Sequence, residues 1–317
     1  MKIQHSFDFD PYCGFSTEEL LSLRSPEEEP ADFDAFWLSV RERAMSEPLK
    51  ILERRKIWSP YSGTDVFEIR YLSWDGVEIG AWVTRPADSE GGLVLGHGYG
   101  NPSTPSFRKR LTTILSCQRG MGLSKHPLIP WEPAEHVLYG IGSRETYSML
   151  GSTVDLWLAV SALLELYPDT AENLHYEGGS FGGGLGALAL AWENRVHSAY
   201  LNVPTFGNHR LRFRFRSTGS GEACRKYCAQ HPEALSVLDY FDASIAASRI
   251  RIPTIVSPAL FDPCVVPPGQ FSIANAIPEV FRTMFILPAG HFEVPENIPV
   301  REEITRLQEA RLYPSGK

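Results

Sequence analysis

Residues 174–185 read LHYEGGSFGGGL, and this stretch decides the fold. Leu174 to Glu177 form a short strand candidate, a Gly-x-Ser-x-Gly pentapeptide follows at 178–182, and small apolar residues from Leu185 to Trp192 predict a helix. A serine on a tight strand-to-helix turn is held clear of the backbone, and flanking glycines avoid collisions of a Cβ atom with both neighbours. The pattern indicates that Ser180 is a nucleophile. The alternative is a glycine-rich helix N-terminus that serves packing or anion binding.

Strand and helix patterns alternate on both sides of this stretch. An Asp75-Gly76 pair between two period-2 runs predicts a hairpin, and the short apolar runs are typical of buried parallel strands. Together they predict an α/β fold, with a doubly wound, mostly parallel sheet and helices on both faces. We expect a single domain over 1–317, with an N-terminal helical extension and insertions. The expected strands cover 65–72, 77–84, 93–96, 174–177, 255–260 and 283–287. The other expected helices cover 33–44, 153–167 and 271–276, and residues 30–32 are expected to cap the first of them.

The composition is that of an ordinary globular chain with an acidic balance. Of 317 residues, 43% are hydrophobic and 21% are charged, and the net charge of −8 argues against nucleic acid as a partner. The alternating arginines at 210–216 are therefore expected to form a solvated element or a subunit contact. The N-terminus has no signal-peptide pattern, and we find no apolar stretch of the roughly 18 residues that span a bilayer, so we expect no membrane contact.

The five cysteines are scattered, and only Cys224 and Cys228 are close in sequence. No second pair completes a zinc-site pattern. We therefore expect reduced structural thiols and a cytoplasmic location.

A nucleophilic serine needs a base, and histidine has a suitable pKa. His291 is the best placed of the nine histidines, because it follows a strand pattern that ends at Leu287 and would lie in a loop at the carboxyl edge of the sheet. His97 precedes a glycine loop and is interpreted as structural. His197 follows the end of a helix, and His209 and His231 fall in polar stretches that indicate the surface.

The base needs a carboxylate that orients it. Asp262 directly follows the strand pattern at 255–260, again at a carboxyl end. Asp239 and Asp242 compete, but they lie in a helix-like run where capping or a surface charge accounts for them. The chain order Ser180, Asp262, His291 is the order found in α/β-hydrolases.

Acyl transfer also needs donors for the oxyanion of the tetrahedral intermediate. The segment His97-Gly98-Tyr99-Gly100 follows an early strand, where hydrolases place one such donor. We assign the backbone N–H groups of Tyr99 and Phe181. An ordinary glycine turn is the alternative for the first.

These residues resemble carbohydrate esterase family 7, the group of acetyl xylan esterases and cephalosporin C deacetylases. The resemblance runs through nearly the whole chain. Its elements are ADFDAFW at 31–37, HGY at 97–99, RGMG at 119–122, the turn at Ser180, Asp262 with Pro267-Pro268, and GHFE at 290–293. Three positions depart from the family pattern: Met121 and Phe181 stand where the family usually has glutamine, and Phe292 separates His291 from Glu293.

The resemblance implies a Ser180–Asp262–His291 triad and an oxyanion hole from the Tyr99 and Phe181 amides. It implies removal of small acyl groups, chiefly acetyl, from acetylated sugars or related esters, with Phe206 and Cys264 lining a small acyl pocket. It also implies a homo-oligomer, a hexamer built as a trimer of dimers, and no metal or other cofactor. The departures leave the acyl preference and the natural substrate open.

Two other functions are weighed against this one. A longer-chain esterase or a peptidase-like hydrolase would use the same fold, although dipeptidyl specificity usually needs an extra propeller domain for which this chain has no room. A binding protein derived from a hydrolase would usually have lost a triad member, and here all three candidates are present.

Overall fold

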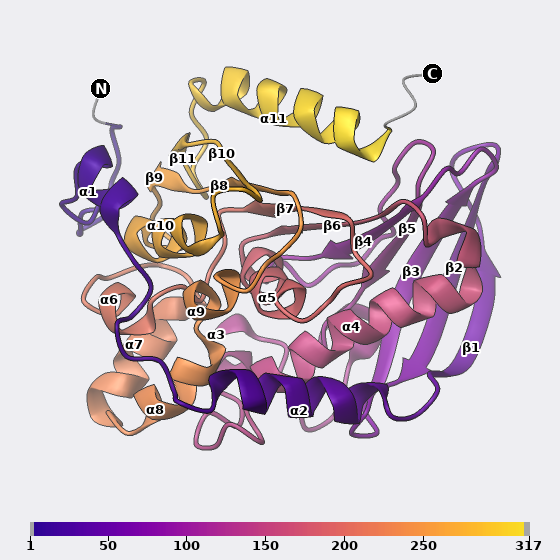
Figure 1. The fold of residues 1–317 in the computed structure, drawn as a ribbon, viewed down its shortest axis with the longest axis horizontal. Helices are drawn as coiled ribbons and strands as arrows, with labels where there is room; N and C mark the ends of the chain where they lie inside the picture. The colour runs from indigo at the N-terminus through magenta and orange to yellow at the C-terminus, as the bar shows by residue number, and fades with distance from the viewer. Residues whose placement is uncertain (1–2, 314–317) are drawn as a thin grey trace.

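The computed structural model describes residues 3–313, and Figure 1 shows a central sheet with helices on both faces. In the described part of the chain, the main sheet has nine strands in the order β1-β2-β3-β5-β4-β6-β7-β8-β10. The first three pair antiparallel with their neighbours, and the strands from β5 to β10 in this order run parallel. The strands are β1 (Lys50–Ile57), β2 (Thr64–Leu72), β3 (Glu78–Pro86), β4 (Gly92–Gly96), β5 (Thr112–Ser116), β6 (Leu174–Gly179), β7 (Ser198–Asn202), β8 (Thr254–Ser257) and β10 (Arg282–Met284).

A second, two-stranded parallel sheet pairs β9 (Ala259–Phe261) with β11 (Leu287–Ala289). The α-helices are α1 (Thr17–Ser22), α2 (Phe33–Met45), α3 (Pro133–His136), α4 (Ser148–Leu166), α5 (Phe181–Leu190), α6 (His209–Arg212), α7 (Ser220–Gln230), α8 (Ala234–Leu238), α9 (Ala243–Ala247), α10 (Pro267–Ala276) and α11 (Asn297–Leu312). Short 3₁₀ helices are η1 (Gly122–Ser124), η2 (Pro168–Thr170) and η3 (Asp239–Phe241). This arrangement confirms the predicted doubly wound α/β fold.

The two faces of the main sheet are covered by different helices. The helices α2, α4, α5 and α9 lie on one side, and α11 lies on the other (Figure 1). Successive side chains of β8 point to opposite faces of the sheet. Val256 packs in the large core with α4 and α5, and Ile255 packs in a smaller cluster with Ile304 of α11. Burial on both faces explains why these strands read as continuous apolar runs.

The strand order reverses between β4 and β6. From β4 the chain crosses to β5 on one side, and β6 lies on the other side. Loops that leave the carboxyl ends of two such strands diverge and open a crevice, which is where ligands bind in open α/β sheets. The loop at 97–100 follows β4, and Ser180 follows β6, so both come to this point.

The helix α4 corrects the expectation about membrane-spanning stretches. Its 19 residues have the length and composition to cross a bilayer, with a mean hydropathy of 1.4 over the best window. That window is 78% buried inside the protein, where Trp157 packs against Trp37 and donates its indole N–H to the Ala189 carbonyl oxygen. The apolar character of α4 is therefore explained by its place in the core.

Several predicted elements end or break at other residues. The single strands expected at 255–260 and 283–287 are each divided, so that β8 and β10 remain in the main sheet while β9 and β11 form the second sheet. Pro258 lies at the first break and has no N–H for the ladder. The strands β1, β5 and β7 were not predicted, and α4 and α5 begin earlier than expected.

Asp32 stands at the N-cap of α2, as predicted, but its side chain does not cap the helix. The carboxylate instead accepts hydrogen bonds from Arg144 and from the Tyr240 hydroxyl. A tertiary contact has replaced the local cap. The hairpin predicted at Asp75-Gly76 is confirmed, since β2 and β3 pair antiparallel across it.

The turn after β6 leaves no room for a side chain at Gly178 or Gly182. A Cβ atom on Gly182 would lie 2.2 Å from the carbonyl oxygen of Gly96, and one on Gly178 would lie 2.5 Å from the carbonyl oxygen of Gly182. Real Cβ atoms do not approach backbone this closely, so β4 and α5 touch through these glycines.

We expect Gly182→Ala to lower the free energy of unfolding by about 1–3 kcal/mol, because β4 and α5 must separate to admit the methyl group. Gly142→Ala is the matched control, since a Cβ atom there would meet nothing within 4 Å. Urea unfolding of both variants measures the difference. An equally small effect of the two substitutions would contradict the close approach.

Candidate active site

Ser180 occupies the turn between β6 and α5 in a backbone conformation that L-residues rarely adopt. Its φ is 54° and its ψ is −113°. Three hydrogen bonds hold this conformation: the Ser180 amide donates to the Asn202 carbonyl oxygen over 2.8 Å, and the Ser180 carbonyl oxygen accepts from the amides of Gly184 and Thr205. Strain of this kind persists only where the surroundings fix it, and it is concentrated at functional sites.

Asp262 and His291 are brought together by the two-stranded sheet. In its register Leu287 pairs with Ala259 and Ala289 pairs with Phe261, so the two chains leave the sheet side by side. The Gly290 amide then donates to the Phe261 carbonyl oxygen over 2.7 Å. A Cβ atom on Gly290 would lie 2.3 Å from Asp262 Oδ2, which shows how closely the two loops pass.

The three predicted residues form one hydrogen-bonded line. His291 Nε2 lies 3.0 Å from Ser180 Oγ, and His291 Nδ1 lies 2.8 Å from Asp262 Oδ2. These distances are within the range for a nucleophile, a base and an orienting carboxylate. Each residue comes from a loop that follows a strand carboxyl end: Ser180 after β6, Asp262 after β9 and His291 after β11.

The Asp262 carboxylate is fully buried, and its environment supplies donors to both oxygens. Oδ1 accepts from the backbone amides of Cys264 and Val265, and Oδ2 accepts from the Gln270 side chain over 2.8 Å as well as from His291. A buried charge without such partners would be strongly unfavourable. Gln270, in the first turn of α10, was missed in the sequence, because it lies just before the helix expected at 271–276.

The hydrogen bonds assign the His291 tautomer. The Asp262 carboxylate only accepts, so Nδ1 carries the proton and Nε2 is free to accept the proton of Ser180. Burial lowers the pKa of His291, but the hydrogen bond and the charge of Asp262 outweigh it, and the net pKa is raised above 6.5. The imidazole therefore becomes a stronger base than an ordinary histidine.

The 97–100 loop lies beside the nucleophile. A Cβ atom on Gly98 would be 4.0 Å from the Cβ atom of Ser180. The Tyr99 ring stacks on the Phe181 ring with centroids 4.0 Å apart and an interplanar angle of 17°. Phe181 is the first residue of α5, so its amide has no acceptor within the helix. Both predicted oxyanion residues thus lie next to Ser180.

His97 has the structural environment that was expected of it. Its Nε2 accepts from the backbone amide of Gln118 over 2.9 Å, and its Nδ1–H donates to the Gly98 carbonyl oxygen over 2.6 Å. Burial lowers the pKa of His97 to about 4, so the ring is neutral at neutral pH. The ring ties the loop after β4 to the turn after β5.

Phe206 and Cys264 both lie close to the triad. Phe206 is buried with φ 69°, and its ring packs edge-on against Phe181 with centroids 5.9 Å apart. Cys264 is half-buried, and its Sγ lies within 4.8 Å of ligand atoms of Asp262 and His291. A thiol, an imidazole and a carboxylate at this spacing could bind a soft cation, although two of the three are hydrogen-bonded to each other.

One surface expectation was wrong, and a second holds with one exception. His209, taken from its polar stretch as a surface residue, is only 2% exposed, and its amide donates to Asp242. In the arginine run, Arg210, Arg214 and Arg216 are exposed, as predicted for a solvated element. Arg212 is the exception, because it is buried and donates to Thr205. The buried Asp242 carboxylate accepts from the backbone amides of Asn208 and His209. It also caps α9, which confirms the capping interpretation of that residue. His231 is exposed, as predicted, and His197 is also exposed.

An N-terminal aromatic segment, also missed in the sequence, covers the loops that carry Asp262 and His291. Phe7 contacts Phe292 with ring centroids 6.2 Å apart, Tyr12 packs edge-on against Phe261, and the Asp262 amide donates to the Pro11 carbonyl oxygen. This segment therefore forms an aromatic cover over the two loops. The alternation of phenylalanine and aspartate at 7–10 is the sequence signal that could have indicated it.

Known proteins share this architecture. A structure of an acetyl xylan esterase from Paenibacillus sp. R4 aligns with a TM-score of 0.81 and 20% identity, over 93% of this chain and 99% of that one. Acetyl xylan esterase 1 from Thermoanaerobacterium sp. JW/SL YS485 aligns with a TM-score of 0.79 and 19% identity, over 96% and 100%. An acylaminoacyl peptidase from Pyrococcus horikoshii aligns with a TM-score of 0.57 and 12% identity, over 84% of this chain but 42% of that one.

At these identities the likeness shows the α/β-hydrolase fold. The family model described as acetyl xylan esterase matches residues 11–303, which include the nucleophile turn and the loops of Asp262 and His291. The chain therefore belongs to the acetyl xylan esterase family and is a serine ester hydrolase.

Proposed function

We propose that this protein removes acetyl groups from acetylated sugars through an acyl-enzyme on Ser180. The hydrogen-bonded line from Ser180 Oγ through His291 to the buried Asp262 is the observation that carries the proposal. Membership of the acetyl xylan esterase family supports the acetyl group and the sugar as the two halves of the substrate. The same family membership does not favour the peptidase-like alternative.

The first half of the reaction forms the acyl-enzyme. Ser180 Oγ attacks the carbonyl carbon of the acetyl ester while His291 Nε2 takes the hydroxyl proton. The negative charge that develops on the carbonyl oxygen is stabilised by the amides of Tyr99 and Phe181, each of which contributes about 3 kcal/mol. His291 then gives its proton to the sugar oxygen as the bond to the carbonyl carbon breaks, and the alcohol leaves.

The second half returns the free enzyme. A water molecule attacks the acetyl group on Ser180 and gives a proton to His291 Nε2. Collapse of the second tetrahedral intermediate breaks the bond to Ser180 Oγ, which recovers its proton from His291, and acetate is released. Asp262 holds the ring in the Nδ1–H tautomer and stabilises the positive charge that forms twice in each cycle.

The size of the acyl group is proposed to be limited by Phe206 and Cys264. Both lie next to the triad, and Phe206 is packed against Phe181 and cannot move without disturbing the buried aromatic cluster. A rigid wall at this position favours an acetyl group over a longer acyl chain, since each misfitting methylene costs about 1–3 kcal/mol.

Three finer statements extend the proposal. Cephalosporin C is an acetyl ester, and the resemblance makes it a second substrate. A cytoplasmic location agrees with five free cysteines among the described residues. The resemblance implies a homo-oligomer, namely a hexamer. Large exposed apolar side chains agree with it, since contacts between subunits would cover them: Trp58 and Val280 are 80% and 82% exposed.

We expect Ser180→Ala to lower kcat for p-nitrophenyl acetate by at least about 10⁴-fold, because the variant has no nucleophile. An acetylated xylo-oligosaccharide, cephalosporin C and a peptide substrate, assayed alongside, test the substrate class. Ser236→Ala removes an exposed hydroxyl and should leave all rates unchanged. Hydrolysis that persists in Ser180→Ala would refute the assignment of the nucleophile, and activity on the peptide alone would refute the substrate class.

The pH dependence of kcat/KM reports the state of His291. The neutral ring is the active form, so kcat/KM should fall as the pH drops through a pKa above 6.5. In Asp262→Asn the charge that raises this pKa is gone, so the acid limb should move to lower pH, while the rate falls by about 10⁴-fold.

Asp239→Asn is the control, because Asp239 pairs with Arg210 away from the triad. It should keep both the rate and the pH profile of the wild type. An acid limb in Asp262→Asn at the wild-type pH or above would show that Asp262 does not set the pKa of His291.

A further inference from the structure

The two residues that are proposed to form the oxyanion hole share one aromatic cluster. The fully buried Phe181 ring is stacked on Tyr99 and meets the edges of His136 and Phe206, with centroids 5.9 Å away in both cases. His136 also meets the Tyr99 ring edge-on at 5.6 Å. It is therefore the one polar side chain of this cluster that contacts both Tyr99 and Phe181 among the described ring contacts.

The hydrogen bonds of His136 fix its ring in one tautomer. Its Nε2 lies 3.1 Å from the Arg119 carbonyl oxygen, which can only accept, so Nε2 carries the proton. Its Nδ1 then accepts from the Tyr99 hydroxyl over 3.1 Å. Burial lowers the pKa of His136 to about 4, so the ring stays neutral at neutral pH. The imidazole thus bridges Tyr99 to the backbone of Arg119.

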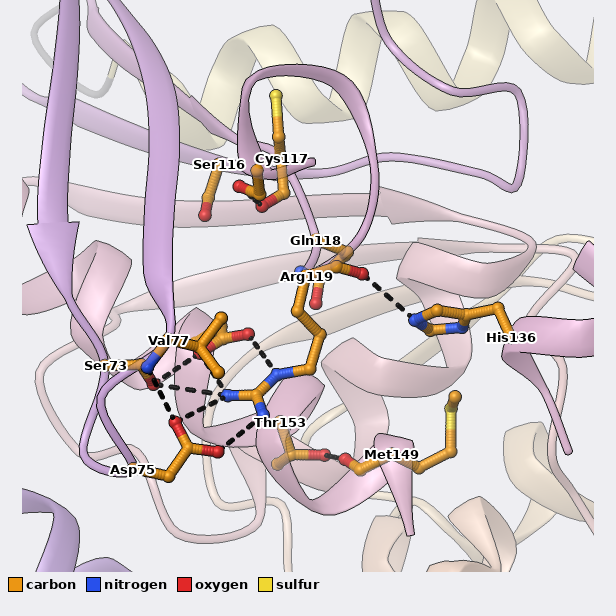
Figure 2. Close-up of polar contacts among 12 residues, drawn as sticks. Ser73, Asp75, Val77, Ser116, Cys117, Gln118, Arg119, His136, Met149 and Thr153 are labelled. Carbon is orange, nitrogen blue, oxygen red and sulfur yellow. Dashed lines mark hydrogen bonds and ion pairs between the residues drawn. The ribbon is translucent and has the colours of Figure 1, made fainter. Parts of the chain in front are cut away.

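Arg119 is an immobile anchor for this bridge. Its buried guanidinium donates to both carboxylate oxygens of Asp155 and to Asp75, and it also reaches the Ser73 hydroxyl (Figure 2). Burial lowers the pKa of Arg119, but the charges of Asp155 and Asp75 outweigh it, and the net shift is upward. These hydrogen bonds hold the Arg119 side chain in place, and through it the backbone of the turn at 117–120.

The turn that carries Arg119 holds the 97–99 loop at two points. The Gln118 amide donates to His97, which in turn donates to the Gly98 carbonyl oxygen. The Arg119 carbonyl oxygen accepts from His136, which in turn accepts from the side chain of Tyr99. Figure 2 shows His136 facing the backbone of this turn while the Arg119 side chain points the other way, toward Asp75.

We propose that His136 is a positioning residue for the oxyanion hole, which it holds by tying Tyr99 and the Phe181 ring stacked on it to the anchored backbone of Arg119. This inference rests on the proposed function, in which the amides of Tyr99 and Phe181 stabilise the oxyanion. The His136 side chain is fully buried, so it is assigned no contact with the substrate. It acts by keeping two amides in the geometry that the transition state needs, and such an effect appears in kcat more than in KM.

Three substitutions separate the parts of the bridge. Tyr99→Phe removes only the hydroxyl and leaves the backbone amide. His136→Gln can keep a donor for the Arg119 carbonyl oxygen but loses the acceptor for Tyr99, and His136→Asn keeps an acceptor near Tyr99 but loses the donor to Arg119. Each cuts the bridge at one end, so each should lower kcat for p-nitrophenyl acetate by about tenfold, less than the loss of a whole donor.

The double variant Tyr99→Phe/His136→Gln distinguishes positioning from general support of the fold. Both changes break the same hydrogen bond, so the double variant should have the kcat of either single variant within about twofold, with KM within about twofold of the wild type. His175→Gln is the matched control: His175 is also buried and hydrogen-bonded, at the far end of β6 from Ser180. It should lower the melting temperature without lowering kcat.

The outcomes separate this inference from the proposed function. Wild-type kcat in folded His136→Gln, or fully additive losses in the double variant, would overturn the positioning role while Ser180→Ala still abolished hydrolysis. If wild-type hydrolysis did not depend on Ser180, the proposed function would fail and the positioning role with it. A variant with a lower melting temperature is assayed well below it, so that loss of fold is not counted as loss of kcat.

Discussion

The buried carboxylate of Asp262 is the constraint on which the site depends. Its side chain is fully shielded from water, so its charge must be balanced by donors that the fold supplies. Two backbone amides, the Gln270 amide and the His291 ring provide them. The same balance fixes the tautomer of His291 and raises its pKa, so the requirement of burial and the requirement of catalysis are met by one set of contacts.

Much of the surrounding architecture serves this carboxylate and the serine opposite it. The sheet of β9 and β11 places Asp262 and His291 side by side, α10 begins with two prolines and brings Gln270 under the carboxylate, and an N-terminal aromatic segment covers the outside. On the other side, the strained backbone of Ser180 is held by hydrogen bonds to Asn202 at the end of β7, to Thr205 in the loop that follows, and to Gly184 of α5. Both halves meet where the strand order reverses, between β4 and β6.

The sequence predicted the parts of this site that depend on local pattern. The glycines around Ser180 indicate a tight turn because only glycine allows the approach of β4 and α5. Asp262 and His291 were predicted from strand ends, even though each strand proved to be two, because the loop that follows was placed correctly. The resemblance to carbohydrate esterase family 7 agrees with the family found, while the single-domain organisation stays a prediction.

What could not be predicted depends on contacts between distant residues. His209 looks like a surface residue in its own segment and is buried by Asp242, 33 residues away. The bridge from Tyr99 through His136 joins positions 37 residues apart and has no local signal. The strand β1, rich in charged residues at the edge of the sheet, lacks the apolar alternation that reveals a half-buried strand.

The most direct test of the account is a crystal structure of the protein after reaction with a small alkyl fluorophosphonate, whose tetrahedral phosphorus resembles the intermediate. The account predicts a covalent bond from Ser180 Oγ to phosphorus, with the phosphoryl oxygen about 2.7–3.1 Å from the amide nitrogens of both Tyr99 and Phe181. An adduct on another residue, or a phosphoryl oxygen that faces away from these two amides, would contradict it.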